Sequence, residues 1–480
     1  MTNDENMFYT ILIIIYFLAF GFWTWKNMKL GIYILIFGLP SYLIRFNLGP
    51  LPMTVLEGMI LILFGIWTIE KLRNKEIKKI RELDFGKIRR WVEKWRGLFG
   101  PIILFLLAGS VAVVVSSETQ AAMGLWKAYF IEPILFFVVL TSVIKKEDLK
   151  NIFWAMAGSS AVVSAVAVYQ KVTGNWIAND FWAAEATRRV SGVFPYPNAL
   201  ALYLAPIVIL LIGFLVKSWG GGKKGIEISR NKVEINRNKL LCCYIVKLLG
   251  WGIVVADLLA VYWSGSKGAI MGIGAGIFFY AVFWKGKRKY FWPVVAIGVV
   301  AAVFLWQSGR INLKGNFSVE GGDSISVRQE MWAESWQMIK DHYMLGAGLA
   351  GYQEVMAEYH QKKYIEIYLY PHNIIFNFWS ETGLLGLLAF LGIIVWFYRR
   401  ALTKLKNDLG FKIYPPASAL SASDWRAGDL RISIAAAMTV VIIHGLVDVP
   451  YFKNDLSVFF WLMIGLMWIA SAGQKGLRRI

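Results

Sequence analysis

Residues 309–386 read GRINLKGNFSVEGGDSISVRQEMWAESWQMIKDHYMLGAGLAGYQEVMAEYHQKKYIEIYLYPHNIIFNFWSETGLLG, and they begin with the one long polar interruption in a chain of apolar runs. The polar part ends in Tyr370-Pro371-His372-Asn373, where a new apolar run begins. The segments before and after it are typical of membrane scaffold. Any chemistry is therefore expected to face the water on the side of the membrane where residues 309–371 lie.

The composition indicates a membrane protein built from helices. Hydrophobic residues make up 57% of the 480 residues, and charged residues make up only 17%. The apolar runs have lengths of about 17 to 25 residues, as a helix that crosses the hydrocarbon core needs. They are continuously apolar, and open sheet edges cannot satisfy their backbone in lipid, which disfavours transmembrane strands. The predicted fold is an all-α polytopic transmembrane helical bundle, a single integral membrane domain over residues 1–480 with one long helical outer loop.

We expect about 12 to 13 spans. They fall near residues 8–25, 30–47, 52–70, 99–115, 122–143, 151–171, 197–216, 241–262, 268–284, 291–308, 372–398, 431–447 and 456–472. Asp4 and Glu5 precede the first run, and no Lys or Arg occurs before Lys26. The basic start of a cleaved signal peptide is therefore missing, and the first run is expected to remain as a membrane helix.

The formal net charge of +20 is spread over the connections between apolar runs. A nucleic-acid partner is not predicted, because no single basic patch forms. The basic clusters occupy every second connection, at residues 26–29, 71–96, 145–150, 217–239, 285–289, 399–431 and 475–479. This alternation assigns these connections to the cytoplasm, and it places the acidic N-terminus and residues 309–371 outside.

Two basic loops, residues 71–98 and 217–240, are predicted to be cytoplasmic. The first has apolar residues among Lys and Arg, as an interfacial helix against anionic lipid does, and docking of a partner is the alternative. The second contains Gly220-Gly221-Gly222, which we interpret as a flexible linker because the spacing of a phosphate-binding loop is absent. The only cysteines, Cys242 and Cys243, are adjacent and form neither a metal-ligand pattern nor a disulfide framework.

Two arginines lie on the predicted outer side, which is normally poor in positive charge. Arg188 and Arg189 come shortly before Pro197-Asn198, which opens an apolar run. They can snorkel to lipid phosphate. They can instead clamp a substrate phosphate, because the guanidinium fork matches pairs of phosphate oxygens.

A helix is predicted to start inside the long loop. Ser326 and Gln329 have capping-box spacing, which places Arg328 in the first helical turn, where backbone N–H groups and the helix dipole favour an anion. Arg328 is therefore a candidate phosphate ligand, and the alternative is a structural ion pair with Glu330 or Glu334.

His372 follows Pro371, and proline favours the first helical position, so His372 is expected in the first turn of its span. The positive helix end would keep the imidazole neutral and able to accept a proton from a sugar hydroxyl. A structural role is the alternative. His342 and His360 lack comparable framing and are expected to be surface residues.

Further candidates lie near the same side. Lys267, in the turn Ser264-Gly265-Ser266-Lys267-Gly268, either snorkels or meets a phosphate. His444 and Asp448 are four residues apart, where they either pair on one helical face or close the helix end. Acids within apolar runs usually line a cavity or pair internally; here they are Glu57, Glu132, Asp257 and Glu381.

Taken together, these motifs resemble the O-antigen ligase and polymerase superfamily over roughly residues 30–470. They are, in chain order, Arg189-Val190-Ser191-Gly192-Val193-Phe194 leading to Pro197-Asn198, Ser264-Gly265-Ser266-Lys267-Gly268, Arg328 with Trp332, Gly346-Ala347-Gly348, and Pro371-His372-Asn373 running to Glu381-Thr382-Gly383-Leu384-Leu385-Gly386. Members are integral membrane glycosyltransferases of the GT-C type, inverting and metal-independent. They move a glycan from an undecaprenyl diphosphate carrier to an acceptor on the periplasmic or external face.

The resemblance implies roles for individual residues. Arg189 and Arg328 would bind the diphosphate, and His372 would be the catalytic histidine. Lys267 would join the diphosphate ligands, although arginine is common at that place, so a bidentate contact is in doubt. The supporting residues would be Asn198, Ser264, Asn373, His444 and Asp448.

The predicted protein is therefore a multi-pass enzyme of the bacterial cytoplasmic (inner) membrane with its active site facing outward. Its partners would be the lipid-linked glycan donor, a glycan, lipid or protein acceptor, and membrane lipid. No cofactor and no metal are expected. The alternative function is a transporter or flippase for an anionic lipid-linked sugar, in which the same arginines serve binding alone.

Overall fold

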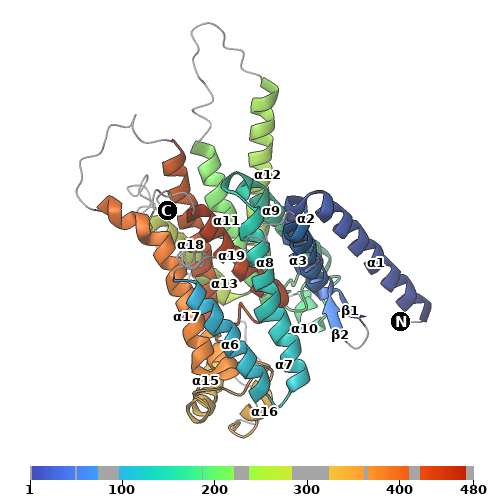
Figure 1. Ribbon diagram of the computed structural model, residues 1–480, viewed down its shortest axis with the longest axis vertical. Helices are drawn as coiled ribbons and strands as arrows, with labels where there is room; N and C mark the ends of the chain where they lie inside the picture. The colour runs from blue at the N-terminus through green and yellow to red at the C-terminus, as the bar shows by residue number, and fades with distance from the viewer. Residues whose placement is uncertain are drawn as a thin grey trace.

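The computed structural model describes residues 3–48, 51–73, 97–185, 188–220, 237–283, 324–361, 366–409 and 422–471. The described chain is mostly helical, which confirms the predicted helical membrane bundle (Figure 1). Within these residues, seven helices are long and apolar enough to cross a membrane, and four further apolar helices have 10–17 residues. Predictions outside the described residues concern the span 291–308, loop residues 309–323, most of loop 71–98, loop residues 221–236 and the basic cluster 475–479.

The helices follow one another along the chain as α1 (Asn3–Lys26), α2 (Met28–Phe37), α3 (Val55–Arg73), α6 (Phe99–Val115), α7 (Thr119–Trp126), α8 (Glu132–Val143), α9 (Leu149–Thr173), α10 (Asp180–Ala183), α11 (Pro197–Gly220), α12 (Arg237–Ser264), α13 (Lys267–Phe283), α15 (Ser324–Asp341), α16 (Tyr352–Met356), α17 (Ile374–Leu409), α18 (Ala422–Gly445) and α19 (Asn454–Ser471). A π-helical turn, Lys127–Ile131, joins α7 to α8.

The span predicted over residues 30–47 is wrong. Helix α2 ends at Phe37, because Gly38 and Pro40 follow and the chain continues as a 3-10 segment, Leu39–Leu43. An antiparallel hairpin comes next, with β1 (Arg45–Leu48) paired to β2 (Leu51–Thr54) and Arg45 opposite Thr54. These strands lie beyond the end of the apolar helix, so they do not conflict with the rule against open strands in lipid.

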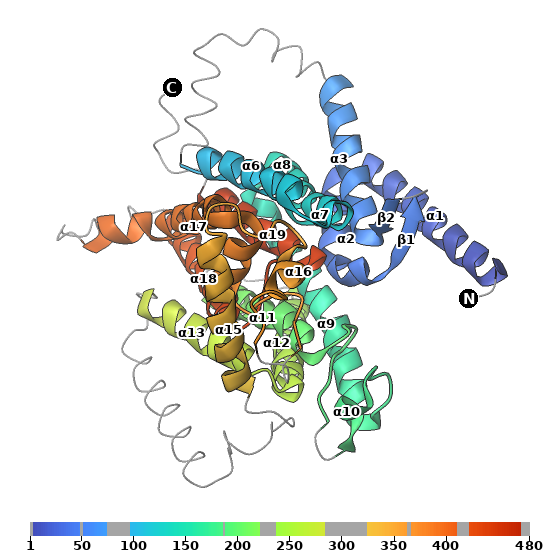
Figure 2. The same cartoon turned by 90° about the horizontal axis from the view of Figure 1, so that it is seen from below.

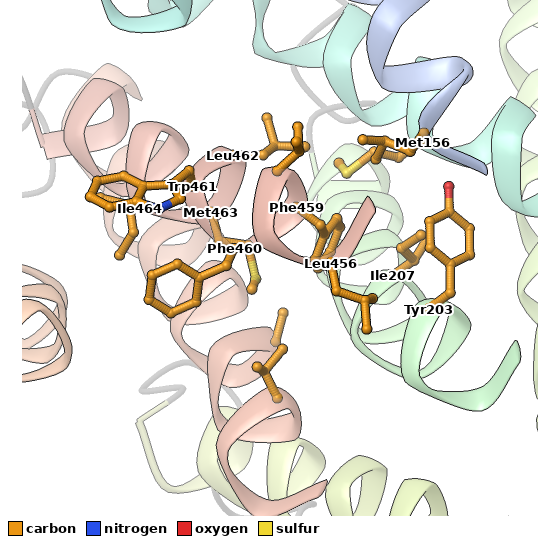
Figure 3. Packing of buried hydrophobic residues seen from close by; sticks show 14 of the residues in the cluster. Met156, Tyr203, Ile207, Leu456, Phe459, Phe460, Trp461, Leu462, Met463 and Ile464 are labelled. Carbon is orange, nitrogen blue, oxygen red and sulfur yellow. The ribbon is translucent and has the colours of Figure 1, made fainter. Parts of the chain in front are cut away.

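The core of the bundle is built around α19. Its residues are buried almost all round, as expected for a helix that is apolar on every side. Figure 3 shows Leu456 and Phe459 of α19 packed toward Met156 of α9 and Tyr203 of α11. By contrast, α1 exposes most of its large apolar side chains, which suits a helix that faces lipid.

Helices α13 and α18 pack closely because glycines line their contact. A Cβ added at Gly268 would lie 2.7 Å from Cδ2 of His444, and one at Gly272 would lie 3.0 Å from the carbonyl oxygen of Val440. Gly276 continues the same row at four-residue spacing, and small residues at this spacing let helix backbones approach each other. The glycine row therefore brings His444 against the start of α13.

One end of the bundle collects the predicted site residues. Helices α9, α12 and α18 end there, and α11, α13, α17 and α19 begin there. Helices α15 and α16 lie at the lower end of Figure 1, and they lie in front of the bundle in Figure 2, which is seen from that side.

Candidate functional site

The segment that carries Arg189 is fixed to helix α9. Oε1 of Gln170 accepts hydrogen bonds from the backbone N–H groups of Ser191, at 2.9 Å, and Gly192, at 2.8 Å. Nε2 of Gln170 also donates to the carbonyl of Gly192. Because Gln170 is fully buried, these bonds hold the loop firmly against the bundle.

Arg189 joins three predicted site segments. Its Nε donates to the carbonyl of Ser264 at 2.7 Å, and its Nη2 donates to Oδ1 of Asn198 at 3.3 Å. Gly265 has φ of +68°, and a Cβ there would lie only 3.0 Å from Nε of Arg189. Glycine is needed at this position for both its conformation and the approach of the guanidinium.

The neighbouring Arg188 has a different role. It donates to the backbone carbonyls of Ala183, at 3.3 Å, and Lys171, at 3.1 Å. The two adjacent arginines are therefore not equivalent: Arg188 fastens the loop to the C-terminal end of α9, whereas Arg189 points to the turn between α12 and α13.

The predicted helix start near Arg328 is wrong in detail. Helix α15 already includes Ser324, so Ser326 lies inside the helix instead of capping it, and Arg328 lies in the second turn. The first-turn argument for anion binding therefore does not apply. Nonetheless, the positive charge of Arg328 acts on both Arg189 and His444. Burial, and then the charge of Arg328, lower the pKa of Arg189 below its ordinary value.

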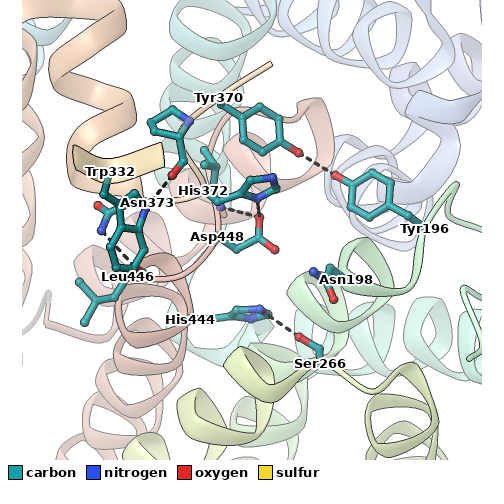
Figure 4. Close-up of polar contacts among 12 residues, drawn as sticks. Tyr196, Asn198, Ser266, Trp332, Tyr370, His372, Asn373, His444, Leu446 and Asp448 are labelled. Atoms are coloured by element: carbon teal, nitrogen blue, oxygen red, sulfur yellow. Dashed lines mark hydrogen bonds and ion pairs between the residues drawn. The ribbon is translucent and has the colours of Figure 1, made fainter. Parts of the chain in front are cut away.

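Helix α15 also holds the segment before His372. Nε1 of Trp332 donates to the carbonyl of Pro371 at 2.8 Å (Figure 4). One helix thus carries Arg328 and, one turn later, the residue that fixes the backbone next to His372.

His372 lies outside its predicted helix. Helix α17 begins at Ile374, and Oδ1 of Asn373 accepts from the N–H groups of Ile375, at 2.9 Å, and Phe376, at 3.2 Å. Asn373 therefore caps the helix, a role for which asparagine is well suited. His372 precedes the cap with φ of +47°. The expectation that the helix end keeps this imidazole neutral loses its geometric basis.

A buried carboxylate faces His372 instead. Nδ1 of His372 lies 3.4 Å from Oδ1 of Asp448, and the same oxygen accepts from the N–H of Val449 at 2.8 Å (Figure 4). Burial tends to raise the pKa of Asp448, but the hydrogen bond and charge of His372, the charge of His444 and the Val449 N–H outweigh it. The pKa of Asp448 falls to about 2.

The helical pairing predicted for His444 and Asp448 is wrong. Helix α18 ends at Gly445, so the four-residue spacing no longer places the two side chains on one helical face. Nε2 of His444 instead lies 3.4 Å from Oγ of Ser266 in the turn before α13. Asp448 reaches His372 from the loop that follows the helix.

Two tyrosines at the site were not predicted. The hydroxyls of Tyr196 and Tyr370 lie 3.1 Å apart, and the ring of Tyr370 packs edge-on against His372 with centroids 4.9 Å apart. Burial raises the pKa of both phenols. The available signal was that each tyrosine precedes a proline at the start of a helix.

Residues 252–391 match the family model described as O-antigen ligase. This match supports the resemblance of the chain to the O-antigen ligase and polymerase superfamily. No curated protein matches the chain. The matched segment contains Ser264, Lys267, Arg328 and His372, whereas Arg189 lies before it. The fold therefore brings Arg189, from outside the matched segment, into contact with Ser264 inside it.

The remaining predicted site residues lie in several places. Lys267 is the first residue of α13 and is half-buried at the turn that contacts Arg189. Asn373 also donates from Nδ2 to the carbonyl of Leu446 at 3.0 Å. The surface position predicted for His360 is wrong, because its Nδ1 lies 3.0 Å from Oε2 of Glu334 and only 14% of its side chain is exposed.

The four acids in apolar runs contact neighbouring groups of the bundle. Oε2 of Glu57 accepts from the N–H of Thr54 at 2.7 Å. The ammonium of Lys127 lies 3.4 Å from Glu57 and 4.0 Å from Glu132. Asp257 accepts from Oγ of Ser164, and Glu381 accepts from the N–H of Ala350 at 2.7 Å.

Proposed function

We propose that this chain is a membrane glycosyltransferase that moves a glycan from an undecaprenyl diphosphate carrier to an acceptor hydroxyl on the outer face of the cytoplasmic membrane. It would act as an O-antigen ligase or a polysaccharide polymerase, in an inverting and metal-independent reaction. One observation carries the proposal: Arg189, Arg328 and the His372–Asp448 pair, which are far apart in sequence, converge at one end of the bundle.

The arginines suit a lipid diphosphate. Arg189 and Arg328 are close enough for their charges to repel, and an anion between them removes that repulsion. The leaving diphosphate gains negative charge as its bond to the sugar breaks, and fixed guanidinium groups stabilise that charge. Lys267, at the same turn, supplies a third positive charge in this proposal.

His372 suits the role of general base. Because Oδ1 of Asp448 is an acceptor, Nδ1 of His372 carries the proton and leaves the lone pair of Nε2 available. Nε2 takes the proton of the acceptor hydroxyl while that oxygen forms its bond to the anomeric carbon. The bond from the anomeric carbon to the phosphate oxygen breaks, its electron pair leaves with the diphosphate, and attack from the opposite face inverts the configuration.

An apolar groove between α9 and α12 suits the polyprenyl tail. It has a volume of about 310 Å³ and is lined by Ala161, Ala165 and Val168 of α9 and Leu248, Gly252 and Ala256 of α12. The same two helices hold Arg189 at one end of the bundle, through Gln170 and Ser264. A tail in this groove would direct its diphosphate toward Arg189.

The test uses the purified protein in detergent with lipid-linked glycan and acceptor. We expect glycoside formation, and we expect Arg328→Ala and His372→Ala to abolish it while the variants remain folded. In cells, the lipid-linked glycan should accumulate in both variants. The matched controls are Arg399→Ala, an exposed arginine on α17, and His342→Ala, a histidine of the same outer loop. Full turnover by His372→Ala would contradict the base assignment.

A transporter or flippase for an anionic lipid-linked sugar uses the same arginines for binding alone. The detergent assay separates this alternative from glycosyl transfer, because a transporter without a membrane makes no product. The transporter would be favoured if the donor bound to Arg189 and Arg328 but no glycoside formed when the acceptor was present.

A further inference from the structure

Lys453 lies in the loop between Asp448 and α19, and its ammonium is surrounded by aromatic rings. Nζ lies 4.5 Å from the ring centroid of Tyr196 and 5.9 Å from those of Tyr42 and Phe194. We call these three rings the aromatic cage. Nζ is buried and has no hydrogen-bond partner among the described residues.

Two more buried polar atoms in the described part of the chain lack a hydrogen-bond partner and belong to the same neighbourhood. They are the hydroxyl of Tyr42 and Oδ1 of Asp455. Asp455 interacts electrostatically with both Tyr42 and Lys453. Burial lowers the pKa of Lys453, whereas the charges of Asp455 and Asp448 raise it.

Nζ of Lys453, the hydroxyl of Tyr42 and Oδ1 of Asp455 together indicate which kind of ligand could bind there. An ammonium only donates hydrogen bonds, a carboxylate oxygen only accepts them, and a phenol does both. Buried groups of this kind are costly without partners. An anionic ligand would meet the charge of Asp455, and an apolar ligand would satisfy none of the three atoms. A neutral polyol satisfies all of them, and the apolar face of a sugar ring packs well on aromatic side chains.

The aromatic cage lies between the two parts of the proposed reaction centre. Tyr196 is two residues before Asn198, which accepts from Arg189, and its hydroxyl lies 3.1 Å from that of Tyr370. Tyr370 is in turn two residues before His372. A sugar bonded to the diphosphate must lie between the arginines and the base, which is where the cage lies.

We propose that Lys453, Tyr42 and Asp455 bind the hydroxyl groups of the donor sugar that is attached to the diphosphate, with Tyr196 packed on its ring. This inference rests on the proposed function. Because Nζ is buried, the sugar reaches it only when the covering side chains turn aside. Lys453 then contributes to recognition of the sugar, whereas Arg189 and Arg328 recognise the diphosphate whatever sugar it carries.

The test compares two ligands that differ only in the sugar. One is undecaprenyl diphosphate, and the other is the lipid-linked glycan extracted from membranes of the producing cells. Binding to the purified protein in detergent is measured by native mass spectrometry. Lys453→Met and Asp455→Asn should weaken binding of the glycan-bearing lipid about tenfold, because the first removes a charged hydrogen-bond donor and the second removes the charge of a hydrogen-bond acceptor. Both should leave binding of undecaprenyl diphosphate unchanged.

Control variants keep the outcomes distinct. Lys29→Met removes a lysine paired with Asp148 at the opposite end of the bundle and should change neither affinity. Arg328→Ala should weaken both ligands, and failure to do so would count against the diphosphate site instead. Unchanged binding of undecaprenyl diphosphate also shows that Lys453→Met is folded. If Lys453→Met weakened binding of both lipids equally, Lys453 would be a phosphate ligand. If it weakened binding of neither lipid, the aromatic cage would be purely structural. Either result overturns the proposed sugar site.

Discussion

Asp448→Asn separates the charge of the carboxylate from its geometry. Oδ1 of Asp448 accepts from the N–H of Val449 at 2.8 Å and also faces Nδ1 of His372 at 3.4 Å. In the asparagine variant the N–H of Val449 still demands an acceptor, so the amide oxygen is expected to stay where Oδ1 lies. The tautomer and orientation of His372 are then kept, and only the negative charge is lost.

The size of the effect follows from this geometry. A hydrogen bond to a charged group is about twice as strong as a neutral one, a difference of about 1 to 2 kcal/mol. In the proposed mechanism the imidazole that becomes protonated during the reaction loses that amount, so kcat should fall about five- to thirtyfold. The KM for the lipid-linked donor should not change, because Asp448 is not a diphosphate ligand in this mechanism. Asp448→Ala also removes the acceptor and should lower kcat about a hundredfold or more.

The assay is steady-state glycosyl transfer by the purified protein in detergent, with donor and acceptor varied separately. Asp341→Asn is the matched control, because Asp341 is exposed and accepts from the Tyr359 hydroxyl, and no hydrogen bond or ion pair joins it to His372 among the described residues. Wild-type kcat in both Asp448 variants would refute the coupling of Asp448 to His372. A tenfold higher donor KM with unchanged kcat would instead assign Asp448 to binding.

The stability of the protein should depend on Asp448 at acid pH. Its pKa in the folded protein is about 2, below the ordinary value of 3.8. A lowered pKa stabilises the fold by about 2 kcal/mol above the ordinary pKa, and this contribution disappears as the pH falls from about 4 toward 2. The melting temperature of the wild type should exceed that of Asp448→Asn at pH 5, and the difference should shrink at pH 3. A constant difference would contradict the assignment.

Two further substitutions test how the site is held. Trp332→Phe removes the hydrogen bond to the carbonyl of Pro371, directly before His372. It should lower kcat severalfold with little change in melting temperature, both measured on the same preparation. An unchanged kcat would show that this hydrogen bond does not position His372. Gly268→Ala places a Cβ 2.7 Å from the His444 ring and should destabilise the protein by about 1 to 3 kcal/mol in a thermal melt. Gly274→Ala on the same helix meets nothing within 4 Å and should melt like the wild type, so equal melting of the two variants would contradict tight packing at Gly268.

The grouping of the site residues could be predicted because the alternation of apolar runs and basic connections assigns each loop to one end of the bundle. Arg189, Lys267, Arg328 and His372 all fall on the same end by that rule, and the structure places them there. The rule says nothing of lateral position within that end. The contact of Arg189 with Ser264, 75 residues away, depends on how α9, α11 and α12 pack together.

Pair contacts and buried polar atoms lay beyond sequence reasoning. The four-residue spacing predicts that His444 and Asp448 either pair on one helical face or close the helix end, and the first alternative fails because α18 ends at Gly445. Nothing in the sequence distinguishes Lys453 among the 51 lysines and arginines of the chain. Only its burial among Tyr42, Phe194 and Tyr196 does so. Burial of a single side chain is a property of the assembled fold and leaves no local pattern.

The position of His372 shows how one extra residue changes a site. Tyr196-Pro197-Asn198 opens α11, and its proline is the first helical residue, as proline prefers. Tyr370-Pro371-His372-Asn373 has the same order with His372 added before the asparagine, and α17 starts only at Ile374. Asn373 caps the helix, so the added residue has to turn back with φ of +47°. That turn keeps the imidazole out of the helix and places it against Asp448.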